Sequence, residues 1–228
     1  MKIVILAGGL GTRLSEYTKT IPKPMVKVAG EPMIFHIMKQ YAKYGFNEFY
    51  IALGYKGEII EKFFKNKKTD WKITLVKTGL NTMTGGRLKR LKKYLKNETF
   101  MLTYGDGISN INLNKLFKFH KKNKKMVTMT AVRPPARFGV IKLNGNQVKY
   151  FKEKSTLDEG WINGGFFIME PDFLKYIKND KTFLEKDPLE KITKKKELIA
   201  YKHFGFWQCM DNKRDKDFLD KNLKKIKF

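Results

Sequence analysis

The chain has 228 residues, 42% of them hydrophobic, which is enough for one large α/β domain with a proper core. Its single cysteine, Cys209, excludes an internal disulfide, and the lack of an apolar run of about 18 residues argues against a membrane-spanning helix. Since no secretory signal is visible, we expect a cytoplasmic protein with no membrane partner.

The formal net charge of +26 at pH 7 raises the question of a nucleic-acid partner. Of the 48 basic residues six are arginine, and the lysines are spread along the chain, as in "KNKKTDWK" and "FHKKNKKM". Proteins that read nucleic acids usually gather arginines and exposed aromatic residues on one face. We therefore expect a solvated lysine surface and no specific nucleic-acid partner, with incidental polyanion binding in low salt.

The first part of the chain alternates short apolar runs with amphipathic segments. The apolar runs predict strands at 2–7, 48–54, 72–78, 99–107 and 126–132, the fourth ending in a turn. The amphipathic segments predict helices at 32–45, 56–66, 85–96 and 112–123, the first with Pro32 at its start and Gly45 at its end. This alternation predicts a mostly parallel sheet with helices on both faces, as in Rossmann-like α/β folds.

The rhythm changes after residue 132. The segment 138–154 predicts a β-hairpin around Asn144-Gly145-Asn146, and strands are expected at 161–170 and 197–203. Helical segments are expected at 171–179, 187–195 and 212–226. No internal repeat or linker is visible, so we predict one domain over 1–228, a mixed sheet with a small β insertion.

The stretch "LAGGLGTRL" (6–14) follows the first strand directly. Glycines bring backbone N–H groups close to an anion, and the N-terminus of a following helix would add a positive dipole. The pattern is neither a P-loop nor the dinucleotide fingerprint, because neither glycine spacing is matched. The stretch therefore favours a phosphate-binding loop of another kind over an ordinary turn.

Lys23 lies between Pro22 and Pro24 in "TIPKPM". A lone lysine is normally a solvated surface charge, but two prolines restrict the backbone on both sides of this one. A compact cation on a rigid loop ten residues after Arg13 is suited to a triphosphate. We therefore predict that Lys23 contacts phosphate.

Asp106 ends a predicted strand in "TYGDG", and "FWQCMD" offers Asp211 as a second carboxylate. Ligands of open α/β sheets bind beyond the carboxyl ends of the strands, where a pair of carboxylates could hold Mg²⁺. A turn aspartate is the competing interpretation of Asp106, since aspartate is common in turns.

Three further segments carry polar residues that suit a nucleotide or a phosphosugar. Glu153 and Lys154 follow a strand, and Asn163-Gly164-Gly165 opens another; an exposed ion pair and a turn are the alternatives. "TGLNTMTGGRLKR" (78–90) could wrap a base or form a simple loop. The three histidines have no spacing typical of a zinc site or a nucleophile–base pair, and we assign them no role.

Together these motifs resemble the sugar-phosphate nucleotidylyltransferases. "LAGGLGTRL" with "PKPM" is similar to the nucleotide-binding signature of that family, and "TGLNTMTGGRLKR", "TYGDG", "RFGVIKL", "INGGFF", "GFWQCMD" and "RDK" resemble its glucose-1-phosphate cytidylyltransferases over nearly the whole chain. The resemblance implies a fold of the nucleotide-diphospho-sugar transferase type, a nucleotide-binding half (1–132) and a sugar-phosphate half (133–228). It implies the reaction of CTP with glucose 1-phosphate to give CDP-glucose and pyrophosphate.

The resemblance also implies roles for individual residues. The nucleotide would be held by Leu6, Ala7, Gly8, Gly9, Leu10, Gly11, Thr12, Arg13, Lys23, Thr82, Arg87 and Gly105. Mg²⁺ would lie on Asp106 and Asp211, and the sugar phosphate would contact Tyr104, Glu153, Lys154, Asn163 and Gly164. Arg13, Lys23 and Lys154 would be the catalytic cations of an in-line attack on the α-phosphorus.

The chain departs from the family between the helix at 56–66 and the strand at 72–78, where members usually carry a longer insertion associated with the subunit interface and the nucleotide surroundings. For that reason a homo-oligomer remains an open alternative. The alternative functions are a uridylyl- or thymidylyltransferase, an enzyme for another sugar 1-phosphate, and an inactive nucleotide-binding module.

Overall fold

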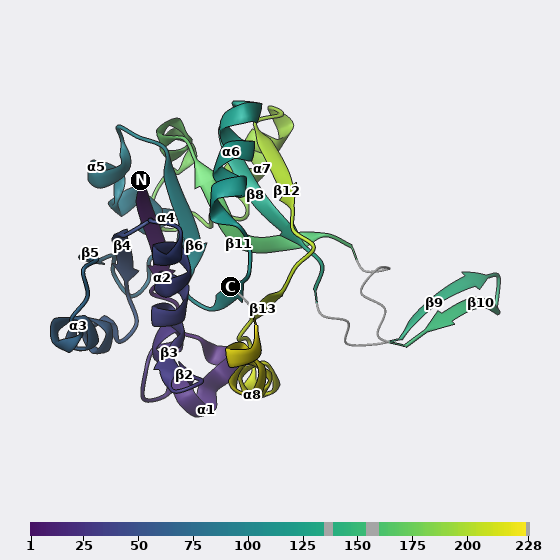
Figure 1. Cartoon of the computed structure of the whole chain (residues 1–228). Helices are drawn as coiled ribbons and strands as arrows, with labels where there is room; N and C mark the ends of the chain where they lie inside the picture. Colours follow the sequence, from purple (N-terminus) through teal and green to yellow (C-terminus); the bar gives the residue numbers. More distant parts are fainter. Residues whose placement is uncertain (135–138, 154–159, 227–228) are drawn as a thin grey trace.

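The computed structural model describes residues 1–134, 139–153 and 160–226. A seven-stranded sheet in the order β12-β8-β11-β6-β1-β4-β5 forms the centre of the molecule (Figure 1). All neighbours in the sheet pair in parallel except β11, which is antiparallel to β6 and β8. The predicted mostly parallel mixed sheet is therefore confirmed. The strands are β1 (Lys2–Ala7), β4 (Glu48–Leu53), β5 (Lys72–Lys77), β6 (Phe100–Tyr104), β8 (Val127–Val132), β11 (Ile162–Met169) and β12 (Leu198–Lys202).

Helices cover both faces of this sheet, because its central strands are apolar on both faces. Alternate residues of β1 point to opposite sides: Ile3 and Ile5 belong to one buried cluster, and Val4 and Leu6 to another. The first cluster includes α2 (Met33–Lys43), α3 (Gly57–Asn66), α6 (Leu113–Asn123) and α8 (Lys213–Asn222). The second includes α4 (Thr84–Arg90), α5 (Lys92–Leu95) and α7 (Asp187–Lys194).

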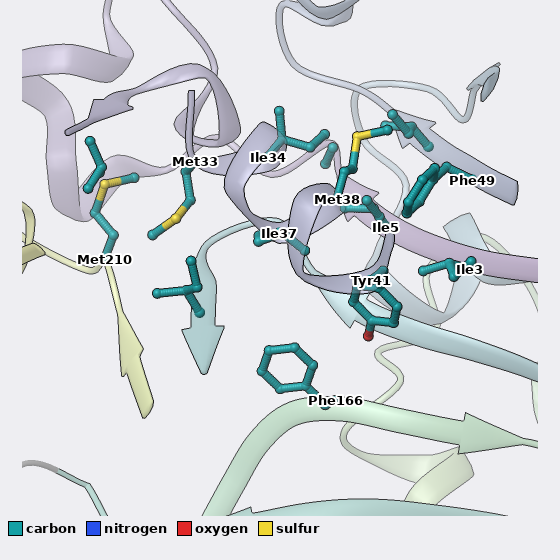
Figure 2. Packing of buried hydrophobic residues seen from close by; sticks show 14 of the residues in the cluster. Ile3, Ile5, Met33, Ile34, Ile37, Met38, Tyr41, Phe49, Phe166 and Met210 are labelled. Carbon is teal, nitrogen blue, oxygen red and sulfur yellow. The ribbon is translucent and has the colours of Figure 1, made fainter. Parts of the chain in front are cut away.

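Helix α2 shows how the sequence pattern produces this packing. Its residues Ile34, Ile37, Met38 and Tyr41 recur at helical spacing and are at most 1% exposed. They lie over the sheet, with the Tyr41 ring stacked near Phe166 of β11 at 6.3 Å between centroids (Figure 2). The amphipathic pattern therefore determines which face of the helix contacts the sheet.

Three predicted helices differ from the structure. The helix expected at 212–226 is α8 followed by the 3-10 helix η4 (Leu223–Lys225). The helix expected at 85–96 is divided into α4 and α5, because Leu91 has ψ 0° and its N–H bonds to Leu88 three residues earlier. Leu88, Leu91 and Leu95 all belong to the second buried cluster. The helix expected at 171–179 is a shorter 3-10 helix, η3 (Pro171–Tyr176), which ends where Ile177 turns to extended backbone and enters the core.

The β insertion is confirmed as a separate two-stranded sheet, β9 (Val140–Asn144) and β10 (Gln147–Lys152), that projects away from the seven-stranded sheet (Figure 1). Its turn holds Gly145 at a φ of +56°, a conformation that glycine adopts readily. Ile141 and Phe151, which face each other across the hairpin, are more than half exposed.

Several short elements were not expected from the sequence. They are η1 (Thr12–Leu14), α1 (Ser15–Thr18), η2 (Lys23–Met25), the pair β2 (Lys27–Val28) and β3 (Glu31–Pro32), and the pair β7 (Gly107–Ser109) and β13 (Trp207–Cys209). Within the described ranges, none of the helices combines the length and the hydropathy needed to cross a bilayer.

Candidate active site

A pocket of about 370 Å³ opens beyond the carboxyl ends of β1 and β6, where open α/β sheets bind their ligands. It contains most of the residues that the sequence predicted to bind a nucleotide, together with Tyr104 and Asp106. The lining consists of Leu6, Ala7, Gly8, Gly9, Gly11, Thr12, Arg13, Lys23, Pro24, Thr82, Met83, Thr84, Arg87, Tyr104, Gly105, Asp106 and Phe183.

The glycine loop forms one wall of the pocket. Gly11 has a φ of +66°, and a Cβ there would lie 2.9 Å from Thr18 Cγ2 and 3.0 Å from Lys23 Cβ. The loop continues into η1 and the four-residue α1, so the helix dipole that we expected is weak here. The glycine loop's backbone, which carries few side chains, and the cations Arg13 and Lys23 would therefore attract an anion.

Arg87 lies underneath this loop and is 4% exposed. Its Nη2 donates to the Gly8 carbonyl at 2.9 Å, and its Nη1 donates to Thr78 Oγ1 and to the Gly79 carbonyl, each at 2.7 Å. A Cβ on Gly8 would lie 2.2 Å from Nη1, so glycine at that position leaves room for the guanidinium. Burial lowers the pKa of Arg87 from its usual value. Arg87 therefore joins the glycine loop to the loop that follows β5.

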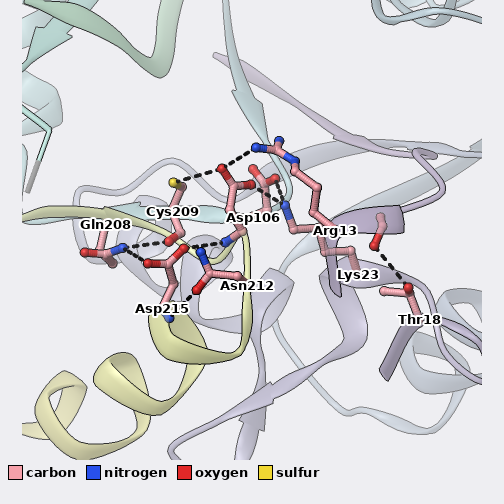
Figure 3. A network of polar contacts seen from close by, with 10 residues as sticks. Arg13, Thr18, Lys23, Asp106, Gln208, Cys209, Asn212 and Asp215 are labelled. Atoms are coloured by element: carbon pink, nitrogen blue, oxygen red, sulfur yellow. Dashed lines mark hydrogen bonds and ion pairs between the residues drawn. The ribbon is translucent and has the colours of Figure 1, made fainter. Parts of the chain in front are cut away.

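Two cations and two carboxylates meet at the end of the glycine loop (Figure 3). Lys23 Nζ lies 2.6 Å from Asp106 Oδ2 and 2.8 Å from Asp211 Oδ1. Arg13 Nη1 lies 2.8 Å from Asp211 Oδ2. The side chain of Lys23 is 10% exposed, whereas that of Arg13 is 73% exposed. Lys23 is thus the central cation of the cluster.

The charges in this cluster stabilise one another. Burial by itself would lower the pKa of Lys23, but the carboxylates of Asp106 and Asp211 outweigh it and hold that pKa above its usual value. Burial would likewise raise the pKa of Asp211, but Lys23 and Arg13 hold it below its usual value. At neutral pH Lys23 is therefore protonated and Asp211 ionised.

Pairing between β7 and β13 brings the two carboxylates together, although they lie far apart in the sequence. The strands pair antiparallel, and the Met210 N–H donates to the Asp106 carbonyl at 2.8 Å. Buried Asp215 accepts from the Asp211 N–H at 3.1 Å and from Gln208 Nε2 at 3.2 Å (Figure 3). Asp215 therefore fixes the backbone that carries Asp211.

The donor set of this cluster fits Mg²⁺. Both carboxylates contact one ammonium group, so a single cation can reach the two of them at once. Mg²⁺ prefers oxygen ligands and is commonly bound by one or two carboxylates together with substrate phosphates. Asp106 also lines the pocket, next to the wall where phosphates would lie.

Polar residues predicted for a sugar lie beside the pocket, in contact with its lining residue Tyr104. Asn163 Nδ2 donates to the Tyr104 hydroxyl at 3.3 Å, and Trp207 Nε1 donates to the Gly164 carbonyl at 2.7 Å. Thr84 Oγ1 and the Tyr104 hydroxyl both donate to Glu185. The structure therefore brings Tyr104, Asn163 and Gly164 together beside the predicted nucleotide site.

Five of the predicted site residues that the structure describes are not part of the pocket lining. They are Asp211, which contacts Lys23, Asn163, which contacts Tyr104, and Gly164, Leu10 and Glu153. Leu10 is 53% exposed and is not part of the pocket lining. Glu153 follows β10 and is exposed. It is not part of the described pocket lining either. Lys154 lies outside the described residues.

Met83 and Phe183 complete the wall near Thr82. Met83 lies in the segment 78–90 that we expected could wrap a base, whereas no motif pointed to Phe183. Phe183 belongs to "KTFLEKDP", a polar stretch that lacks any motif, and it meets the pocket because its loop packs on α4. The Met83 N–H donates to the Asp180 carbonyl at 2.8 Å, and the Gly86 N–H donates to the Thr182 carbonyl at 3.2 Å.

Known proteins resemble this chain over nearly its full length. A family model described as "Nucleotidyl transferase" matches residues 2–209. A glucose-1-phosphate cytidylyltransferase of Salmonella typhimurium (strain LT2) and another of Salmonella typhi are each 44% identical, over 96% of this chain and 95% of the relative. The structure of HddC from Yersinia pseudotuberculosis, complexed with GMP-PN, has a TM-score of 0.76 at 25% identity. The match covers 97% of this chain and 99% of the HddC chain.

Proposed function

Because the chain belongs to the nucleotidyl transferase family, we propose that it transfers CMP from CTP to glucose 1-phosphate, forming CDP-glucose and pyrophosphate. The observation that carries this proposal is the cluster of Lys23, Arg13, Asp106 and Asp211 at the end of the glycine loop. Such a cluster suits a reaction between two anions, and the relatives that are 44% identical are named for this reaction.

Both reactants carry negative charge, so their mutual repulsion is the main obstacle. The glycine loop would hold the triphosphate, with Arg13 and Lys23 neutralising the phosphates that leave as pyrophosphate. Lys154 would neutralise the incoming sugar phosphate. Asp106 and Asp211 would hold Mg²⁺, which when bound screens charge on the phosphates. Lys23 would then shift its contacts from carboxylates toward phosphate oxygens.

The attacking group needs no general base, because a phosphate monoester is largely ionised at neutral pH. A phosphate oxygen of the sugar phosphate would form a bond to the α-phosphorus of CTP, while the bond from that phosphorus to the pyrophosphate oxygen breaks in line. The protein would contribute orientation and charge stabilisation, and the histidines would take no part.

Recognition of the nucleotide and of the sugar would be divided between the halves 1–132 and 133–228 of one domain. Thr82, Met83 and Phe183 would contact the base, because they form the pocket wall beyond Gly8 and Arg87. Tyr104, Asn163 and Gly164 would contact the sugar.

Pyrophosphate release tests this proposal. Purified protein is assayed with Mg²⁺ and glucose 1-phosphate, comparing CTP, UTP, dTTP and GTP, and the D211N variant controls for a contaminating enzyme. A strong preference for CTP that D211N abolishes is expected. Preference for another nucleotide would keep the mechanism and replace the substrate. No release with any nucleotide or hexose 1-phosphate would favour an inactive nucleotide-binding module.

A further inference from the structure

Glu185 lies in the loop between η3 and α7 and accepts hydrogen bonds from both sides of the pocket. The Tyr104 hydroxyl donates to its Oε1 at 2.7 Å, and Thr84 Oγ1 donates to its Oε2 at 2.7 Å. Thr84 Oγ1 in turn accepts from the Leu184 N–H at 2.9 Å, so its own proton is directed to Glu185. One carboxylate thus joins the end of β6 to the start of α4.

The charge of Glu185 determines the direction of the next hydrogen bonds. An ionised carboxylate only accepts, so the Tyr104 proton points to Glu185 and the Tyr104 oxygen accepts from Asn163 Nδ2 at 3.3 Å. Asn163 Oδ1 accepts from the Gly165 N–H at 2.8 Å. The Gly165 N–H therefore fixes the amide orientation of Asn163, and Glu185 takes the Tyr104 proton so that the Tyr104 oxygen can accept from that amide.

The Tyr104 ring is held independently of Glu185. Gly165 has a φ of +78°, and a Cβ there would lie 2.6 Å from Tyr104 Cδ2. The Phe167 ring packs edge-on, with 5.9 Å between centroids. Packing places the ring, and Glu185 is left to orient its proton.

A carboxylate beside a phosphate pocket opposes the binding of anions, which makes its position informative. Within the part of the chain that the structure describes, Glu185 contacts neither Arg13 nor Lys23, and it accepts hydrogen bonds from the neutral groups of Tyr104 and Thr84. We infer that Glu185 is a positioning residue: it takes the Tyr104 proton, so that the Tyr104 oxygen holds the Asn163 amide in place for the hydroxyl groups of the sugar. This inference rests on the proposed function, because it concerns the sugar substrate of that reaction.

Steady-state kinetics of E185A and E185Q test the inference, with E190Q as the matched control. Glu190 is an exposed acid of α7, five residues along the chain. E185A should raise the KM for glucose 1-phosphate roughly tenfold, as expected for losing a hydrogen bond to a charged group, and leave the KM for CTP nearly unchanged. E185Q should have a similar effect, because its amide N–H₂ reverses one of the two hydrogen bonds. E190Q should match the wild type.

A double-mutant cycle shows whether Glu185 acts through Tyr104. In the Y104F background the effect of E185A on the KM for glucose 1-phosphate should largely disappear. A full effect in that background would overturn the inference. So would a rise in the KM for CTP alone, or a fall in kcat with both KM values unchanged.

Amide hydrogen exchange of the substrate-free protein gives a readout that does not need activity. Exchange at residues 162–167 should accelerate in E185A and stay unchanged in E190Q, because the Gly165 N–H depends on Asn163 Oδ1. Unchanged exchange in E185A would overturn the inference. If the wild type releases no pyrophosphate, the proposed function fails, and this exchange still decides whether Glu185 holds the Tyr104 and Asn163 pair.

Discussion

Replacing Lys23 by methionine removes the central cation of the site but keeps most of the buried aliphatic stem. Lys23 Nζ lies 2.6 Å and 2.8 Å from the two carboxylates, so their nearest oxygens are at most about 5.4 Å apart. Two like charges at that distance repel each other by about 3 kcal/mol at an effective dielectric constant of about 20. Arg13 still neutralises part of the charge on Asp211, so we expect K23M to lose about 2–3 kcal/mol of unfolding free energy at pH 7.

Thermal unfolding followed by circular dichroism measures this loss. For a chain of this size, about 2–3 kcal/mol corresponds to a fall in Tm of roughly 5–10 °C. Added Mg²⁺ should restore more of the Tm in K23M than in the wild type, because a cation can then replace the ammonium between the carboxylates. K19M is the matched control, because Lys19 is an exposed lysine near the same loop.

The pH dependence follows from the directions of the pKa shifts. The lowered pKa of Asp211 contributes stability above its unfolded value of about 4, and this contribution is lost as pH falls through the folded pKa. The raised pKa of Lys23 contributes stability below about 10.5, which is lost as pH rises through the folded pKa. The difference in Tm between wild type and K23M should therefore be largest between these limits and narrow below about pH 4.

Activity completes this prediction. K23M should lower kcat/KM for CTP by on the order of 10²-fold or more, as for the loss of a donor that stabilises transition-state charge. An unchanged Tm at pH 7 would refute the electrostatic reasoning. Near wild-type kcat/KM would remove Lys23 from the mechanism, whatever the Tm.

Three further predictions concern other parts of the site. D106N should fold normally and require much more Mg²⁺ for half-maximal pyrophosphate release; an unchanged Mg²⁺ titration would make Asp106 a turn residue. G11A should lower the unfolding free energy by about 1–2 kcal/mol, measured by urea titration, because its φ of +66° is unfavourable for alanine; equal stability would show that the loop relaxes. Burial, followed by nearby carboxylates, raises the pKa of the Cys209 thiol to about 12, so iodoacetamide at pH 8 should alkylate it far more slowly than a free thiol; rapid alkylation would contradict this.

Local patterns in the sequence were enough for much of the fold. The apolar runs predicted β1, β4, β5, β6, β8, β11 and β12. Most of the predicted strand ends lie within about two residues of the observed ends, as is usual for such boundaries. Asn144-Gly145-Asn146 predicted the hairpin, and the motifs predicted a resemblance that the cytidylyltransferase relatives confirm. These features could be predicted because they depend on neighbouring residues or on motifs read directly from the chain.

The sequence alone determined the glycine loop, the lysine between two prolines and the order of strands and helices along the chain. Tertiary structure decided which of these residues meet: β7 and β13 place Asp211 beside Asp106, and Lys23 lies between them. It also buried Arg87 beneath Gly8 and brought Glu185 to Tyr104. Each of these contacts joins segments far apart in the chain, so it depends on the packing of whole elements, which local spacing does not encode.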